Sequence, residues 1–133
     1  MMEEHGNVGR VREALKTFNR GDLDAYREFF DADVVWFVRG THPMAGAYRG
    51  VDALFEYFGR AREVTGGSLR IEPVDVVADG HHAGVVARVR GRREDGRKLD
   101  IEMTEAFTFA DDGRVTEFWA LAADQPAVDA FWA

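Results

Sequence analysis

Three Asp-Gly pairs divide the second half of the chain into four runs of strand-forming residues. The pairs are Asp79-Gly80, Asp95-Gly96 and Asp112-Gly113, and this dipeptide is preferred in tight turns between antiparallel strands. We therefore predict a four-stranded antiparallel meander. The runs near 82–93 and 98–109 are about twice the usual strand length of 5–6 residues, so the sheet is expected to twist and curl enough to enclose a ligand.

The first half has the apolar spacing of helices. Residues 8–18 repeat apolar side chains at helical positions, which predicts a helix that ends at Asn19-Arg20-Gly21. Asp22 is the expected cap of a second, shorter helix that ends at Asp31-Ala32-Asp33. A third helix is predicted over 51–61 and is closed by glycines at 66–67.

One strand and a final helical turn complete the expected elements. The run 34–38 is apolar on both faces, which predicts a buried strand followed by a loop over 39–50. Asp124, with Pro126 just inside, opens a last short helical turn. Its apolar residues, through Trp132, are expected to dock on the body as a lid.

The composition limits the chain to a single domain, residues 1–133, and excludes several classes of function. With 46% hydrophobic and 31% charged residues, there is material for one core and one cavity. Zero cysteines exclude disulfides and thiolate chemistry. Ser68 is the only serine and has no neighbouring histidine, so no serine triad is expected. The net charge of −7 has the wrong sign for binding nucleic acid or an anionic membrane, and we expect neither as a partner.

Neither a metal site nor a membrane segment is expected from the sequence. His81 and His82 are adjacent strand residues that point to opposite faces, and no other histidine has metal-ligand spacing. No apolar run approaches the length of about 18 residues that a membrane span needs, and Met1–Arg10 lacks the apolar part of a signal peptide. We therefore expect a cytoplasmic protein that needs no metal and no other cofactor.

Glu105 interrupts an otherwise apolar row of the predicted strand 98–109. A glutamate removed from water resists ionisation, and its pKa rises by up to about 3–5 when it is fully buried and unpaired. Such an acid can donate or relay a proton. The alternative is that Glu105 pairs with an arginine near the rim, or that a bulge turns it outward. The apolar residues of the same face are Leu99, Ile101, Met103, Phe107 and Phe109.

Pairing with the preceding strand decides which way Glu105 points. A three-residue loop over 94–96 places Val85 opposite Glu105, whereas a two-residue turn places Arg88 opposite the apolar Met103. The three-residue loop also pairs Arg88 with Glu102 on the other face. Because both faces favour this alignment, we adopt it and expect Glu105 to point into the interior.

The alignment of the last strand is left open. If the turn at Asp112-Gly113 has two residues, Glu105 faces Ala120 and Phe118. If the turn has three residues, Glu105 faces Trp119, because a shift of one residue moves every side chain to the other face.

Two residues after the first strand are further candidates. His42 could act as an acid or base near neutral pH, but a histidine before proline in a glycine-rich loop is also typical of a turn. Arg39 could meet a ligand carboxylate or Glu105, although strand-end arginines are more commonly solvated or paired with a surface acid. We keep Glu105 and His42 as the candidate catalytic residues.

Several segments resemble the nuclear transport factor 2-like superfamily. Residues 18–30, followed by Asp33-Val34-Val35-Trp36, are similar to its helix-turn-helix-strand opening, and residues 45–50 and 115–119 are similar to its SnoaL-like and ketosteroid isomerase-like branch. The resemblance spans about residues 8–123. It implies a conical, cystatin-like α+β barrel, in which a curved, mostly antiparallel sheet encloses a pocket and packs around three N-terminal helices. It also implies a homodimer formed through the outer face of the sheet.

The resemblance allows the roles of ketosteroid isomerase to be tested by position. That enzyme uses an aspartate base and an oxyanion hole made of a tyrosine and a protonated aspartate. The tyrosine falls on Ala14, the base on Val38 and the protonated acid on Glu105. Since two of the three roles are vacant, that mechanism is not expected here, although an inward Glu105 is.

We carry two functions forward from the sequence. The first is a cofactor-free isomerase, cyclase or hydrolase acting on a small hydrophobic, cyclic molecule through Glu105 and His42. The second is a non-catalytic ligand-binding or dimeric accessory module. The residues expected to line the pocket are Ala14, Phe18, Trp36, Val38, Leu54, Tyr57, Phe58, Val85, Ala87, Met103, Phe107, Phe118 and Ala120.

Overall fold

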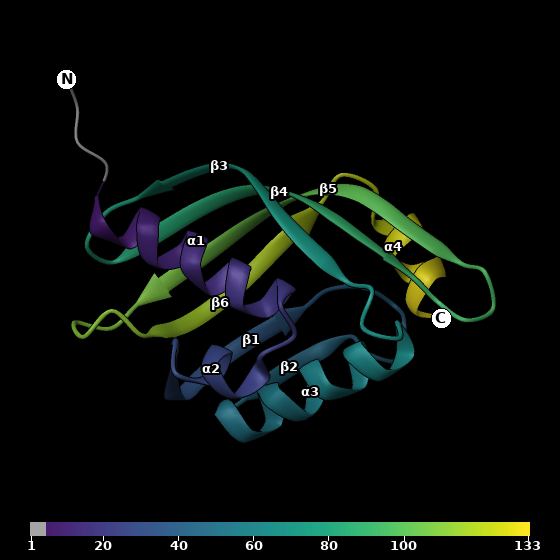
Figure 1. The fold of residues 1–133 in the computed structure, drawn as a ribbon, viewed down its shortest axis with the longest axis horizontal. Helices are drawn as coiled ribbons and strands as arrows, with labels where there is room; N and C mark the ends of the chain where they lie inside the picture. The colour runs from purple at the N-terminus through teal and green to yellow at the C-terminus, as the bar shows by residue number, and fades with distance from the viewer. Residues whose placement is uncertain (1–4) are drawn as a thin grey trace.

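Six strands form one mixed sheet in the computed structural model, which describes residues 5–133 (Figure 1). Residues 1–4 of the polar N-terminal segment lie outside that description. The elements in chain order are α1 (Gly6–Asn19), α2 (Leu23–Arg27), β1 (Phe30–Val38), β2 (Gly46–Arg49), α3 (Val51–Val64), β3 (Arg70–Ala78), β4 (His82–Arg92), β5 (Lys98–Phe109), β6 (Val115–Ala122) and α4 (Gln125–Trp132).

The sheet has the order β2-β1-β6-β5-β4-β3. Strands β3 to β6 form the predicted antiparallel meander, and β1 joins it through a parallel pairing with β6. The expected barrel is wrong in one respect, because the sheet is not closed and β2 and β3 remain its edges. Instead of a further strand, helices pack near the two edges of the sheet. Helix α1 packs along β3, and α3 packs along β1 and β2.

Two boundaries in the first half differ from the prediction. The second helix ends at Arg27 rather than at 31–33, and β1 already begins at Phe30, which pairs with Val115 of β6. The predicted loop 39–50 contains the short strand β2, whose Gly46 pairs with Val38. Both differences arise because these residues pair with distant strands of the sheet. Local sequence patterns do not indicate such pairing.

The predicted starts of α2 and α4 and the glycine end of α3 are confirmed. The Asp22 carboxylate accepts a hydrogen bond from the backbone N–H of Ala25 at the start of α2, and Asp124 does the same for Ala127 at the start of α4. These side chains satisfy backbone donors that the first helical turn leaves free. Gly66 closes α3 with a φ of 60°, a value that favours glycine.

The alignment of β4 with β5 is the predicted one, with Val85 opposite Glu105 and Arg88 opposite Glu102. The alignment of β5 with β6 combines the two alternatives. The turn has three residues, since the N–H of Ala110 bonds to the carbonyl of Arg114. One irregular position then shifts the register, so Glu105 faces Ala120 rather than Trp119. Such a β-bulge adds one residue to one strand and moves all later side chains by one position.

The apolar interior is split into two clusters. The larger one lies between α1, α2, α3 and the sheet and includes Tyr26, Trp36 and Phe58. The smaller one lies beneath α4 and includes Leu99 and Phe131. Figure 1 shows α4 at one end of the curved sheet, beside the β4–β5 hairpin. The final helix therefore docks on the body as expected, and its role as a lid stays a prediction.

Candidate functional site

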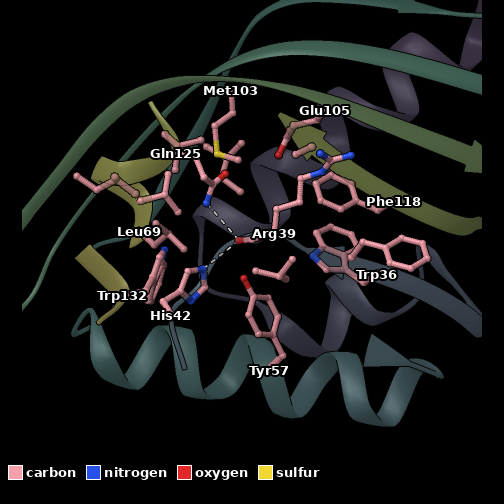
Figure 2. A pocket seen from close by; sticks show the side chains of 17 residues that line it. Trp36, Arg39, His42, Tyr57, Leu69, Met103, Glu105, Phe118, Gln125 and Trp132 are labelled. Carbon is pink, nitrogen blue, oxygen red and sulfur yellow. Dashed lines mark hydrogen bonds between the residues drawn. The ribbon is translucent and has the colours of Figure 1, made fainter. Parts of the chain in front are cut away.

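A cavity of about 100 Å³ lies where the two apolar clusters meet. It is partly open to solvent, and its wall is formed by the end of β1 and the loop that follows, by α3, by strands β3 to β6, and by α4 (Figure 2). An engineered apolar cavity of about 150 Å³ holds benzene. A ligand of that size therefore fits only with part of it at the open side.

Most of the wall is apolar, and five polar or charged residues interrupt it: Arg39, His42, Tyr57, Glu105 and Gln125. This combination of an apolar surface with a few convergent polar groups is typical of small-molecule sites.

The structure places eight of the predicted site residues on the cavity wall: Trp36, Val38, His42, Tyr57, Met103, Glu105, Phe118 and Ala120. The other seven lie elsewhere. Leu54, Phe58, Val85 and Ala87 are buried in the larger cluster, Ala14 and Phe107 border a separate small space beside α1 and α2, and Phe18, in the last turn of α1, borders a third space.

A cluster of packed aromatic rings, here called the aromatic plug, separates the residues on the cavity wall from those that lie elsewhere. Trp36 stacks on Phe118 with ring centroids 3.6 Å apart, and Phe58 meets Trp36 edge-on at 5.2 Å. Phe58 also contacts Phe18 and Tyr26. These rings fill the middle of the fold, so the predicted deep pocket is reduced to the part between the plug and α4.

The Glu105 carboxyl group lies inside the fold. Its residue is 4% exposed, and Oε1 is the one buried side-chain oxygen or nitrogen in residues 5–133 that has no hydrogen-bond partner. Burial raises the pKa of Glu105 from 4.5 to about 8, because a carboxylate loses its hydration there and gains no cation in exchange. At neutral pH Glu105 is therefore mostly a carboxylic acid, which can donate a proton.

The His42 ring is held by its own loop. Its Nδ1 accepts a hydrogen bond from the backbone N–H of Met44 at 3.2 Å, so the ring proton is on Nε2, which donates to the carbonyl of Arg39 at 3.2 Å. The residue is 7% exposed. Neither nitrogen is free to act on a ligand unless a loop hydrogen bond breaks first, and a catalytic role for His42 stays a prediction.

Besides the Glu105 carboxylic acid, the phenol of Tyr57 is a second O–H donor on the cavity wall. It belongs to α3, and Figure 2 shows its hydroxyl directed into the cavity. Burial first, and then the neighbouring Tyr48 and Glu105, raise the pKa of Tyr57 above its usual value. The phenol therefore keeps its proton at neutral pH.

The α4 wall was expected only as a lid, without named lining residues. It contributes Gln125, Val128 and Trp132 to the cavity. Gln125 donates to the carbonyl of Arg39 at 3.3 Å, and the Asp129 carboxylate accepts from the backbone N–H of Thr41 at 3.1 Å. These bonds fasten α4 to the segment after β1. The helical spacing of the apolar residues in α4 indicated that this helix packs on the body of the protein. It did not indicate which surface the helix covers.

Among residues 5–133, no three His, Cys, Asp or Glu side chains are grouped closely enough to hold a metal ion. In the same part of the chain, no helix is long and apolar enough to cross a membrane.

Comparison with known proteins gives one matching family and several relatives. The model of the SnoaL-like domain matches residues 11–118. An uncharacterised protein of Mycobacterium tuberculosis is 34% identical, over 99% of this chain and all of its own length. The solved structure of Bal32a, from a soil-derived mobile gene cassette, is 31% identical with a TM-score of 0.89 and covers 96% of both chains.

A proposed polyketide cyclase from Sinorhizobium meliloti is also similar. It is 26% identical with a TM-score of 0.69, over 84% of this chain and 92% of its own. Other solved proteins that share the fold are described as cystatin-like or nuclear transport factor 2-like. These similarities agree with the observed fold.

Proposed function

Because this chain belongs to the SnoaL-like domain family, we propose that its cavity binds a small hydrophobic, cyclic molecule beside Glu105. The observation that supports this is the buried Glu105 carboxyl, which lies on the cavity wall with one oxygen unpartnered. A buried polar atom without a partner costs about 1–3 kcal/mol. A ligand oxygen that meets this carboxyl would offset that cost.

The chemistry that fits is proton donation without a cofactor. Glu105 would give its proton to a ligand oxygen as that oxygen gains negative charge, and Tyr57 would stabilise the same region by a hydrogen bond. A proton released elsewhere on the ligand, or from water in a hydrolysis, restores the acid. Isomerisation, cyclisation and hydrolysis all meet this requirement. The ketosteroid isomerase base has no counterpart, since Val38 is on the wall and cannot accept a proton.

We expect Glu105→Gln to lower turnover by about 10²-fold or more, the usual contribution of a general acid. The assay is a panel of small cyclic ketones, lactones and epoxides, with product detected by mass spectrometry. Glu102→Gln is the matched control, because Glu102 lies on the same strand but faces Arg88 on the outer side of the sheet. Full activity of Glu105→Gln on any substrate found would contradict the role of Glu105.

A non-catalytic binding module is the second candidate. It is favoured by the small cavity and by the absence of a free base among the described wall residues, since both His42 nitrogens are occupied. A ligand that binds the wild type and Glu105→Gln without being converted by either would support this candidate.

We also propose a homodimer that uses the outer face of the sheet. This face exposes large apolar side chains on β3 and β6, among them Val77, Trp119 and Leu121, which are 64%, 38% and 48% exposed. Val77 and Trp119 belong to one row across this face, through Gly84 of β4 and Ala106 of β5, and exposed apolar side chains gathered on one face mark interaction sites. A two-fold dimer would cover the same patch of both copies.

Leu121→Glu is expected to give a monomer in light scattering coupled to size-exclusion chromatography, because it places two like charges in the proposed interface. Gly59→Glu is the control, since it adds the same charge on α3, where a new side chain meets no atom within 4 Å. A wild type that stays monomeric at high micromolar concentration would rule out the dimer.

A further inference from the structure

We propose that the ligand of this cavity is an organic carboxylate and that Arg39 binds its carboxylate group where the cavity meets solvent. The proposal rests on the proposed function, since it concerns the ligand of the same cavity. It adds the chemical class of the ligand and a residue that selects it.

Charge on the cavity wall is the first support. Among the described residues, the cavity wall contains one arginine, Arg39, and one acidic residue, Glu105. Buried Glu105 is mostly uncharged at neutral pH, and His42 carries its single proton on Nε2 because Nδ1 accepts from Met44. The wall is therefore positive by one charge, in a chain whose net charge is −7. A neutral ligand would leave that cation without a counterion.

The position of Arg39 is the second support. Of the residues that line the cavity, Arg39 is the one that is exposed, which places it at the mouth, whereas Glu105 is 4% exposed. In the view of Figure 2 the Arg39 side chain lies between Glu105 and Trp36. A ligand with its carboxylate on Arg39 can extend its apolar ring along the wall toward Glu105.

Arg39 has no acidic partner in the part of the chain that the structure describes. Other arginines pair with carboxylates within 4.0 Å, as Arg88 does with Asp100 and Arg97 with Asp95, but none of the ion pairs of residues 5–133 includes Arg39. An unpaired guanidinium keeps its full capacity to bind an anion.

The main chain of Arg39 is held in place although its side chain is solvated. Its carbonyl accepts hydrogen bonds from His42 Nε2 at 3.2 Å and from Gln125 Nε2 at 3.3 Å. The next residue, Gly40, has a φ of 126° and packs against α4. The loop and α4 thus fix the point from which the guanidinium starts, which reduces the entropy lost on binding.

A carboxylate fits this site better than a phosphate. The guanidinium offers two parallel N–H groups that match the two oxygens of a carboxylate. A phosphate monoester carries close to two negative charges at neutral pH, and no second cation lines the described cavity wall. One fixed positive charge and an apolar wall select a hydrophobic monoanion.

The test compares benzoate with benzamide, a neutral molecule of nearly the same shape. Dissociation constants at neutral pH are measured by NMR titration for the wild type, Arg39→Gln, Arg39→Lys and Glu105→Gln. We expect the wild type to bind benzoate at least about tenfold more tightly than benzamide, as one charge-assisted hydrogen-bonded pair provides. Arg39→Gln should bind both equally, and Arg39→Lys should keep part of the preference because it keeps the charge.

Arg49→Gln is the matched control, because it removes one exposed arginine on β2 that does not line the cavity. It should keep the preference for benzoate, and so should Glu105→Gln. Equal binding of both probes by the wild type, or an unchanged preference in Arg39→Gln, overturns the role of Arg39 and leaves the proposed function standing. If neither probe shifts resonances of the cavity wall, the carboxylate proposal is contradicted, whereas the proposed function is decided separately by turnover of the substrate panel.

Discussion

Glu105→Gln is expected to remove a loss of stability on the order of 3–5 kcal/mol that the wild type undergoes between about pH 4.5 and pH 8. The pKa of Glu105 is 4.5 when the side chain is free in solution and about 8 in the fold. Between those values the unfolded chain releases a proton that the folded chain keeps. The free energy of unfolding therefore falls as the pH rises, and it levels off above pH 8, where Glu105 is ionised in both states.

The measurement is urea unfolding of the wild type and Glu105→Gln at several pH values, with the difference between the two curves as the readout. Other groups, such as Asp79 and Asp100, whose pKa values are lowered by hydrogen bonds from backbone N–H groups and from Arg88, contribute equally to both variants and cancel. Glu102→Gln should follow the wild type. A pH-independent difference would show that Glu105 is hydrated or paired in solution.

Gly40→Ala is expected to destabilise the fold by about 3–5 kcal/mol and to release α4 from the cavity. Gly40 has a φ of 126°, which other residues rarely adopt, and a Cβ there would meet Asp129 Oδ1, Gln125 Nε2 at 2.9 Å and His42 Cδ2 at 2.8 Å. Backbone strain costs about 1–3 kcal/mol, and each hydrogen bond lost between α4 and the loop costs about 1 kcal/mol.

Gly46→Ala is the matched control for the backbone term. Gly46 has a similar φ of 147°, but a Cβ there meets no atom within 4 Å. Its effect in urea unfolding should therefore be limited to the strain. Hydrogen exchange over 125–132 should become much faster in Gly40→Ala and stay unchanged in Gly46→Ala. Equal effects of the two substitutions would mean that α4 is not fastened through Gly40.

These two results would bear on function together. The first tests whether a proton donor is stored at the bottom of the cavity, and the second tests whether α4 is the wall that keeps water from it. A buried acid is useful to a reaction only while the site stays dry, because water restores the ordinary pKa of a carboxyl group. Loss of α4 packing should therefore also lower the pKa of Glu105.

Much of the fold is determined by short-range sequence patterns. The Asp-Gly pairs mark the strand ends, and Asp22 and Asp124 mark helix starts, because turns and caps depend on a few adjacent residues. The inward direction of Glu105 could also be derived, since one alignment of β4 and β5 satisfies apolar pairs on one face and opposite charges on the other. Because side chains alternate between the two faces of a strand, each alignment places Glu105 either on the inner or on the outer face.

Other features were decided by contacts between distant parts of the chain. The bulge that sets Ala120 opposite Glu105 and the pairing that makes 46–49 a strand both arise from neighbouring strands. Composition shows that aromatic rings are present, but three-dimensional packing alone decides that Trp36 and Phe58 close the deep end while Trp132 of α4 lines the remaining space. The sequence by itself determined that an acid lies inside an α+β fold. Only the tertiary structure decided how much room faces that acid and that Arg39 lies at the entrance, because both depend on how whole elements pack rather than on the order of residues within one.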